Sequence, residues 1–317
     1  MVWILGALGL VILLLAGDAL VKGAVNFSLR LGVPPLIISL TIVAFGTSAP
    51  ELLIAVSAVE EHAPGIAIGN VVGSNIANVL LVLGVPALLA PLATSGCETR
   101  KNFLFMIVAS VLFAFVAFLS PITWVTGVGF LVVLALILTD SARDALRHRK
   151  TDRGIDGEDT LGLEEADPEM PGARIAMYLG LGLIGLPLGA ELLVDSAVDI
   201  ARMFHVSETV IGLTLVAVGT SLPELATTVM AALRRQADVA LGNVIGSNMF
   251  NLLAIIGVAS LVGDIPVAPE ILRFDVWVML AAAVVLVPFV YLRKDITRMW
   301  GVAFCALYAL YIGWIIT

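Results

Sequence analysis

The sequence has 317 residues, a net charge of −8 and only 13% charged residues, while 60% of its residues are hydrophobic. Because about a quarter of the residues in soluble globular proteins are charged, this composition excludes an ordinary soluble protein and predicts an integral membrane protein. Long apolar runs that contain Gly and Pro, without a ten-residue alternating pattern, favour transmembrane helices over an outer-membrane barrel.

Ten segments are apolar over about 20 residues, the length that a helix needs to cross a membrane. In chain order they are 2–22, 33–58, 66–90, 102–120, 122–140, 174–200, 207–232, 237–262, 273–292 and 297–317. No positive residue precedes the first segment and no clean cleavage site follows it, so we interpret it as a retained helix rather than a signal peptide. The sequence therefore predicts an all-α membrane protein with ten transmembrane helices.

The distribution of basic residues supports this count. With ten spans, 15 of the 17 Lys and Arg residues fall on one side of the membrane, and only Arg202 and Arg273 fall on the other. Cytoplasmic loops are enriched in Lys and Arg. We therefore expect a multi-pass protein of the cell membrane with both termini extracellular.

The longest connector, residues 141–173, is rich in acidic residues and is expected in the cytoplasm. It lacks the regular spacing of a calcium-binding EF-hand loop, so we interpret it as a solvated linker. The predicted organisation is a first unit at 1–140, this linker, and a second unit at 174–317. Cys97 and Cys305 indicate neither a disulfide nor a metal–thiolate site.

The segment 38–84 recurs at 211–257, with an offset of 173 residues and 23 identities in 47 positions. Both copies contain G-T-S-x-P-E, which places Glu51 and Glu224 inside apolar runs. A carboxylate in such a segment costs roughly 2.5 to 3.5 kcal/mol to insert and by default marks a functional site. Each half has five predicted helices, an odd number, so the second copy must cross the membrane in the opposite direction. Inverted repeats of this kind typify secondary transporters with a site near the midplane.

Each motif combines a helix break with a cluster of oxygen atoms. Pro50 and Pro223 lack an N–H group, so we expect free backbone carbonyls in the turn before each proline, at Ala44, Phe45, Ala217 and Val218. Hydroxyl groups three and four residues before each glutamate share its helix face; they belong to Thr47, Ser48, Thr220 and Ser221.

The helix after each motif carries a polar stripe at every fourth residue, formed by Asn70, Ser74 and Asn78 in one copy and Asn243, Ser247 and Asn251 in the other. Asn75 and Asn248 lie beside these stripes. The alternative role of such groups is hydrogen bonding between helices, and it stays open for Asn70, Asn75, Asn243 and Asn248.

Two carboxylates, hydroxyls, amides and carbonyls form an all-oxygen set, which hard cations prefer. Ca²⁺ takes about six to eight oxygen ligands in flexible geometry, whereas Mg²⁺ dehydrates reluctantly. Ca²⁺ is thus the expected substrate, with Na⁺ as a competitor. Close carboxylates also attract protons, so H⁺ is expected to compete.

The paired G-T-S-x-P-E motifs, each followed by G-N-V-(V/I)-G-S-N, resemble the repeats of the sodium/calcium exchangers within the cation/calcium antiporter superfamily. The resemblance covers nearly the whole chain and is to the short prokaryotic type without regulatory domains. It implies an antiporter that exports Ca²⁺ from the cell against entering Na⁺. The ion ligands that it implies are Ala44, Thr47, Ser48, Glu51, Ser74 and Asn78, and Ala217, Thr220, Ser221, Glu224, Ser247 and Asn251.

Two features distinguish the chain from parts of that family. Asn251 stands where some members have an aspartate, which lowers the negative charge available to the site, and the 141–173 connector is too short for the calcium-sensing domains of animal exchangers. Proton-coupled relatives typically carry a G-N-A-x-E type motif instead, so the sequence favours sodium coupling. A proton/calcium antiporter remains the alternative, while a channel lacks an evident filter or pore ring.

Nothing in the sequence indicates enzymatic chemistry, a cofactor, a nucleic-acid partner or an obligate protein partner. The expected partners are Ca²⁺, Na⁺ and the lipid bilayer.

Overall fold

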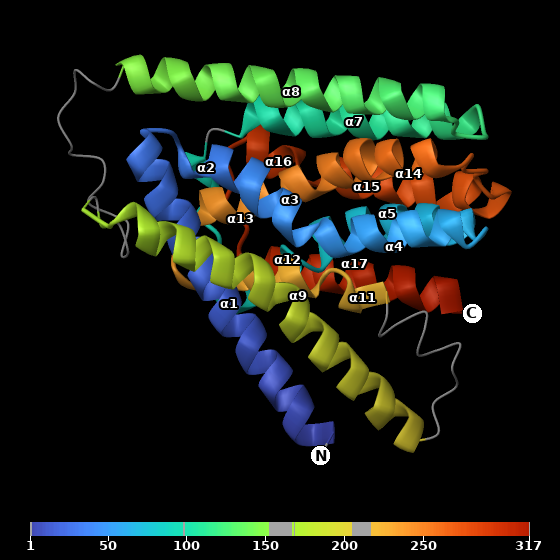
Figure 1. Ribbon diagram of the computed structural model, residues 1–317, viewed down its shortest axis with the longest axis horizontal. Helices are drawn as coiled ribbons and strands as arrows, with labels where there is room; N and C mark the ends of the chain where they lie inside the picture. The colour runs from blue at the N-terminus through green and yellow to red at the C-terminus, as the bar shows by residue number, and fades with distance from the viewer. Residues whose placement is uncertain (1, 98, 152–166, 168, 205–216, 317) are drawn as a thin grey trace.

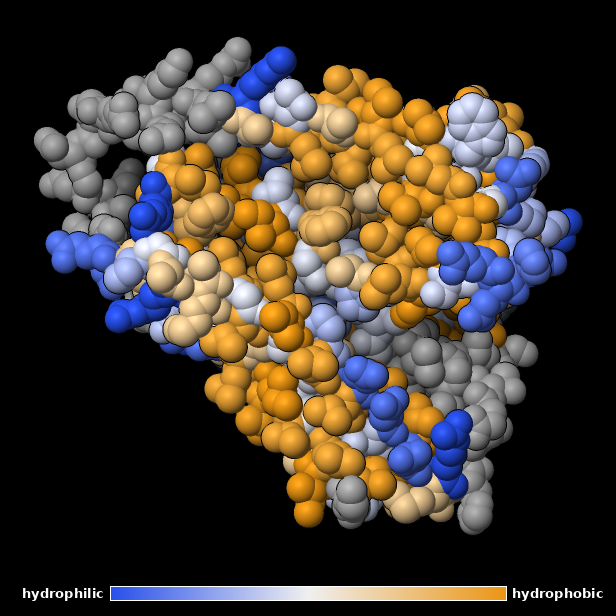
Figure 2. Space-filling view, in the orientation of Figure 1, coloured by the Kyte–Doolittle hydropathy of each residue, from blue (hydrophilic) through white to orange (hydrophobic). Residues whose placement is uncertain are grey.

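The computed structural model describes residues 2–97, 99–151, 167, 169–204 and 217–316, and helices dominate all the longer ranges (Figure 1). The described residues contain eight helices long and apolar enough to cross a membrane, and a ninth span if the bent pair Pro35–Thr47 and Ala49–Glu60 is counted as one. Figure 2 shows a broad hydrophobic surface with hydrophilic residues gathered mainly towards its left and right edges, as expected for a protein that spans a bilayer.

The nine spans coincide with nine of the ten predicted segments. The remaining predicted segment, 207–232, contains the apolar helix α12 (Leu222–Leu233), and its residues 207–216 lie outside the described ranges. The predicted fold class, an all-α membrane protein, is confirmed.

Two long helices, α1 (Val2–Leu31) and α9 (Gly172–Met203), pack against each other and tilt away from the other helices (Figure 1). A Cβ atom on Gly9 would lie 2.7 Å from the backbone nitrogen of Leu193, and one on Gly182 would lie 2.5 Å from the Cβ of Leu20. These two contacts are related by the 173-residue offset. Small residues let helix backbones approach closely within a membrane, so glycine at these positions fixes the pair as one layer.

The first copy of the repeated motif forms a broken helix. It begins with α2 (Pro35–Ile38), continues through the π-helical turn η1 (Ser39–Val43) into α3 (Ala44–Thr47), and bends by 43° before α4 (Ala49–Glu60). In the second copy, α11 (Ala217–Gly219) precedes the break and α12 follows it. The predicted interruptions are therefore present in both copies.

The polar-stripe helices occupy the centre of the molecule. The span that contains α5 (Pro64–Leu80) and α6 (Gly84–Leu89) is 78% buried over its most apolar window, and the span that contains α13 (Ala237–Met249) is 83% buried, against at most 44% for the other six unbroken spans. After α13 the chain continues through the π-helical η5 (Phe250–Ile255) into α14 (Ile256–Val262).

The remaining helices surround this centre. They are η2 (Thr94–Gly96), α7 (Arg100–Phe118), α8 (Trp124–Thr151), the π-helical η6 (Ile271–Asp275), α15 (Val276–Val285), α16 (Val287–Tyr291) and α17 (Arg298–Ile316). Helix α8 continues past residue 140, where we expected its span to end, because the polar residues that follow still form helical turns. Most of the acidic part of the predicted linker lies outside the described residues.

Two isolated β-bridges reflect the internal repeat. One joins Leu92 to Ile296 and the other joins Ile122 to Ile265. Leu92 and Ile265 differ by 173 residues, and Ile122 and Ile296 differ by 174. Each bridge is therefore the counterpart of the other, with the roles of the two halves exchanged.

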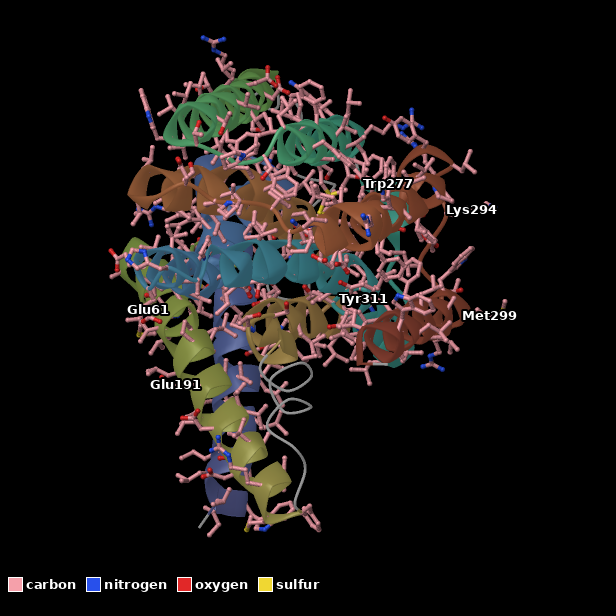
Figure 3. The ribbon with its side chains drawn as sticks, turned by 90° about the vertical axis from the view of Figure 1, so that its right-hand side faces the viewer. Glu61, Glu191, Trp277, Lys294, Met299 and Tyr311 are labelled. Atoms are coloured by element: carbon pink, nitrogen blue, oxygen red, sulfur yellow. The ribbon has the colours of Figure 1, made fainter. Side chains whose placement is uncertain are left out.

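The layer formed by α1 and α9 makes different contacts with the two halves. Helix α1 packs along α12, where a Cβ on Gly17 would lie 3.0 Å from the carbonyl oxygen of Ala226, and Arg234 forms an ion pair with Asp18. The positions that correspond to Asp18 and Arg234 are Glu191 and Glu61. Both are exposed acidic residues along one edge of the molecule (Figure 3).

Candidate cation-binding site

The two helix breaks have nearly the same backbone geometry. Ser48 has φ and ψ of −84° and 5°, and Ser221 has −88° and 6°. In each copy the proline is the second residue of the following helix, where the missing N–H would have no helical partner. The glutamate comes next, within the first helical turn, so Glu51 and Glu224 enter the bundle from equivalent positions.

Both carboxylates are buried, with exposed fractions of 1% for Glu51 and 0% for Glu224. The Ser48 hydroxyl, from the first copy, donates a hydrogen bond of 3.2 Å to Oε1 of Glu224, in the second copy. The hydroxyls of Thr47 and Ser247 also face the Glu224 carboxylate, and Glu51 lies close enough for charge repulsion with Glu224. The two motifs thus share one site.

Thr47 connects the first motif to helix α13. Its hydroxyl lies 3.3 Å from Oδ1 of Asn243 and 3.5 Å from Oγ of Ser247. Asn243 also donates to the Thr228 hydroxyl at 3.1 Å and to the backbone oxygen of Glu224 at 3.3 Å. Asn243 therefore braces α12 against α13, in keeping with the helix-packing role that its sequence position left open.

The asparagines of α5 and α13 meet across the two halves. Asn78 donates from Nδ2 to Oδ1 of Asn248 at 3.1 Å, and Asn248 donates to the backbone oxygen of Asn75 at 3.5 Å. Asn75 and Asn248 are equivalent residues of the two repeats, so this contact joins the same position of both halves. The polar stripes therefore face each other at the centre of the molecule.

Several buried oxygen atoms at this centre have no hydrogen-bond partner among the described residues. They are Oε2 of Glu51, Oε2 of Glu224, Oδ1 of Asn75, Oδ1 of Asn78, Oδ1 of Asn251 and Oγ of Ser221. Unpaired polar atoms in an apolar interior cost several kcal/mol each unless something satisfies them. A bound cation satisfies oxygen atoms of this kind, and the donor set contains no sulfur or imidazole.

The site holds only two acidic side chains. Among the described residues, no group of three or more His, Cys, Asp or Glu side chains could hold a metal ion. The negative charge comes from Glu51 and Glu224 alone, and all other candidate ligands are neutral oxygens.

The helix breaks free fewer carbonyls than the prolines led us to expect. The Ala44 oxygen accepts hydrogen bonds from the Ser48 N–H at 3.0 Å and the Thr47 hydroxyl at 3.2 Å, and the Val218 oxygen accepts the Ser221 N–H at 3.1 Å. The expectation that these two carbonyls are free is therefore wrong, because the tight turn at each serine closes onto them. For Ala217, the structure describes only its backbone position at the start of α11.

Ser74 and Thr220 line a pocket of about 480 Å³ together with Asn70. Residues of η6 and α17 complete the pocket, among them Asp275, Tyr308 and Tyr311. We did not single out Asp275 in the sequence, although a carboxylate inside the predicted span 273–292 is the same kind of signal that identified Glu51.

Paired broken helices that bury two carboxylates among neutral oxygens, within inverted repeats, define a cation transporter of the antiporter class. The sodium/calcium exchanger protein family matches residues 1–140 and 175–317. The chain therefore belongs to the sodium/calcium exchanger family and is a multi-pass membrane antiporter rather than an enzyme.

Relatives and solved structures agree on this assignment. The chain is 35% identical to the sodium/calcium exchanger MaX1 of Methanosarcina acetivorans, covering 96% of this chain and 95% of that one. It is 34% identical to the inner membrane protein YrbG of Escherichia coli K12, covering 87% and 85%. The sodium-calcium exchanger NCX_Mj, from crystals soaked without Na⁺ and Ca²⁺, superposes with a TM-score of 0.83 at 33% identity over 99% of this chain and 100% of that one.

Proposed function

We propose that the protein exchanges Na⁺ for Ca²⁺ by alternating access and uses the Na⁺ gradient to export Ca²⁺ from the cell. One observation carries this proposal: the hydrogen bond of 3.2 Å from Ser48 to Glu224 joins the two halves at a pair of buried carboxylates. The family supports it, since MaX1 is a sodium/calcium exchanger and NCX_Mj has been studied in crystals soaked with both ions.

The charge of the site explains why the two ions would exclude each other. Two carboxylates balance one Ca²⁺, two Na⁺ or two protons, and an uncompensated surplus of either sign inside the bilayer is costly. A third Na⁺, held by neutral oxygens, would make each cycle move one net charge. That charge would couple transport to the membrane potential at about 2.3 kcal/mol per 100 mV.

We assign ion coordination to the carboxylates and to the oxygens that converge on them. The proposed ligands are Glu51, Glu224, Thr47, Thr220, Ser48, Ser221, Ser74, Ser247, Asn78 and Asn251, with the backbone oxygens of Ala44 and Ala217. A carbonyl oxygen has two lone pairs. The Ala44 oxygen already accepts two hydrogen bonds, so the Thr47 hydroxyl would turn away from it when both bind an ion.

The α1 and α9 layer is the element that we propose to move. Its two helices contact each other closely through glycines, and α1 lies against α12. A rocking motion of this layer across the carboxylates would expose the site to one face at a time. The repeats 1–140 and 174–317 would serve as the two halves, with the 141–173 linker in the cytoplasm and both termini outside the cell.

Reconstitution into vesicles tests the coupling ion. Purified protein is placed in proteoliposomes loaded with Na⁺ and diluted into Na⁺-free buffer with radioactive Ca²⁺, and the same uptake is measured with a pH gradient and no Na⁺. The proposal expects Ca²⁺ uptake with the Na⁺ gradient alone. Uptake with the pH gradient alone would instead identify a proton/calcium antiporter, and uptake with neither gradient would identify a channel.

A further inference from the structure

The pocket beside the candidate site contains a carboxylate that the two repeats do not share. Its walls come from α5, η6 and α17, and its polar residues include Asn70, Ser74, Thr220 and Asp275. The rest of the lining is mainly isoleucine and tyrosine. A pocket of about 480 Å³ is large enough for a hydrated cation, and it reaches the two proposed ligands Ser74 and Thr220.

Asp275 is an acidic residue in the second turn of a membrane span. It lies within the span Ile271–Tyr291 and is neither fully buried nor fully exposed. Its Oδ1 accepts a hydrogen bond of 3.0 Å from the Tyr311 hydroxyl. No Lys, Arg or His among the described residues forms an ion pair with it. A carboxylate kept in a membrane span without a basic partner points to a functional role.

The local backbone favours this placement. Asp275 ends the π-helical turn η6, and π-helical turns occur frequently at functional sites because the extra residue turns side chains out of the regular helical register. Tyr311, with an exposed fraction of 8%, is held by stacking against Phe274, with ring centroids 6.3 Å apart. The hydroxyl that meets Asp275 is thus fixed by packing (Tyr311 is labelled in Figure 3).

The α5 surface that lines the pocket has free space beside its glycines, whereas the equivalent glycines of α13 are closely packed. A Cβ atom on Gly69 or Gly73 would meet nothing within 4 Å. The equivalent residues are Gly242 and Gly246, where a Cβ would lie 2.9 Å from the Leu36 oxygen and 2.5 Å from the Leu40 oxygen, respectively. The α5 face therefore leaves free space from Asp275 towards Ser74.

We propose that Asp275, supported by the Tyr311 hydroxyl, forms an outer cation site that collects Na⁺ and Ca²⁺ in this pocket and passes them to Ser74 and Thr220. A charged group in a cleft with low-dielectric walls concentrates counter-ions locally and raises their association rate. One carboxylate and one hydroxyl are too few for tight binding of a dehydrated Ca²⁺. The ion is therefore held loosely with its water and moves on.

This inference rests on the proposed function, and the experiment separates the two. Ca²⁺ uptake is measured at several Ca²⁺ concentrations in vesicles of each orientation, at low ionic strength, for the parent protein, Asp275→Asn and Tyr311→Phe. Asp275→Asn should raise the KM for Ca²⁺ by about threefold or more on the face that carries the C-terminus, leaving kcat and the opposite face unchanged. Tyr311→Phe keeps the charge and should have a smaller effect.

Salt and a control variant sharpen the test. At about 1 M of a salt that is not transported, the Debye length falls to about 3 Å, so the KM difference should largely disappear. Asp264→Asn removes a carboxylate from a separate pocket, beside His62 and Glu60, and should leave the KM unchanged. If the parent protein transports Ca²⁺ but Asp275→Asn has the parent KM at low salt, the outer site is refuted. If the parent protein fails to transport Ca²⁺, the proposed function itself fails.

Discussion

The Ser48 hydroxyl reaches across the two repeats and donates a hydrogen bond of 3.2 Å to Oε1 of Glu224. This bond lies at the break of the first motif and at the carboxylate of the second, so neither motif forms the site alone. Its position beside two buried acidic side chains makes the site sensitive to small chemical changes.

Neutralising either glutamate should abolish exchange. In Glu51→Gln or Glu224→Gln, one of the two charges that balance Ca²⁺ is lost, and we expect Na⁺-driven Ca²⁺ uptake to fall by about 100-fold or more. The side-chain volume is retained, so the protein should keep its elution profile in size-exclusion chromatography. Glu60→Gln, at the exposed end of α4, is the matched control and should transport normally. Normal uptake by Glu224→Gln would rule out a shared carboxylate site.

Removing the Ser48 hydroxyl should weaken ion binding without abolishing transport. Ser48→Ala loses a donor to a charged acceptor, a contact that contributes about 1.5 to 3 kcal/mol. Because the same hydroxyl is a proposed ligand, we expect the KM for Ca²⁺ to rise by about tenfold or more, which corresponds to about 1.4 kcal/mol or more. Ser57→Ala, on α4 and away from the break, should behave like the parent protein. An unchanged KM in Ser48→Ala would show that the hydroxyl takes no part in binding.

Acid should inhibit Ca²⁺ transport by competition. The site needs both carboxylates charged to hold Ca²⁺, and protons occupy the same oxygens, so lowering the pH removes the binding-competent form. We expect the KM for Ca²⁺ to rise steadily as the pH is lowered, while the rate at saturating Ca²⁺ changes little, because protons and Ca²⁺ compete for the same two carboxylates. A KM independent of pH, measured with the pH equal on both sides, would contradict the charge argument.

The equivalent glycines of α5 and α13 should respond differently to the same substitution. In Gly246→Ala, the new Cβ would lie 2.5 Å from the Leu40 oxygen and 2.6 Å from the Ala44 Cβ, which pushes the first broken helix away from Ser247. Overpacking of this kind costs about 1 to 3 kcal/mol, and we expect a lower melting temperature in detergent and a higher KM for Ca²⁺.

Gly73→Ala is the matched control for Gly246→Ala. Its Cβ would meet nothing within 4 Å, so the melting temperature should stay at the parent value. If both alanine variants melt at the same temperature, the difference in packing between the two halves does not control stability.

The sequence analysis identified the repeated residues but not the unrepeated Asp275. Glu51 and Glu224 were identified because each lies in an apolar run and each has a counterpart. The residue that corresponds to Asp275 is Asn102, so the duplication gave no signal there. The carbonyl prediction failed for a local reason, since proline spacing alone does not reveal that the Thr47 hydroxyl and the Ser48 N–H both turn onto the Ala44 oxygen.

The contacts of α1 and α9 with the rest of the protein differ between the two halves, and this difference has an energetic consequence. If the repeats were identical in sequence, the states open to opposite faces of the membrane would be related by a two-fold rotation and equal in energy. Asp18 pairs with Arg234 at one end, whereas the corresponding residues Glu191 and Glu61 carry like charges. Inverting the structure would therefore exchange an attraction for a repulsion. Under the proposed alternating access, this difference would make the two states unequal in energy.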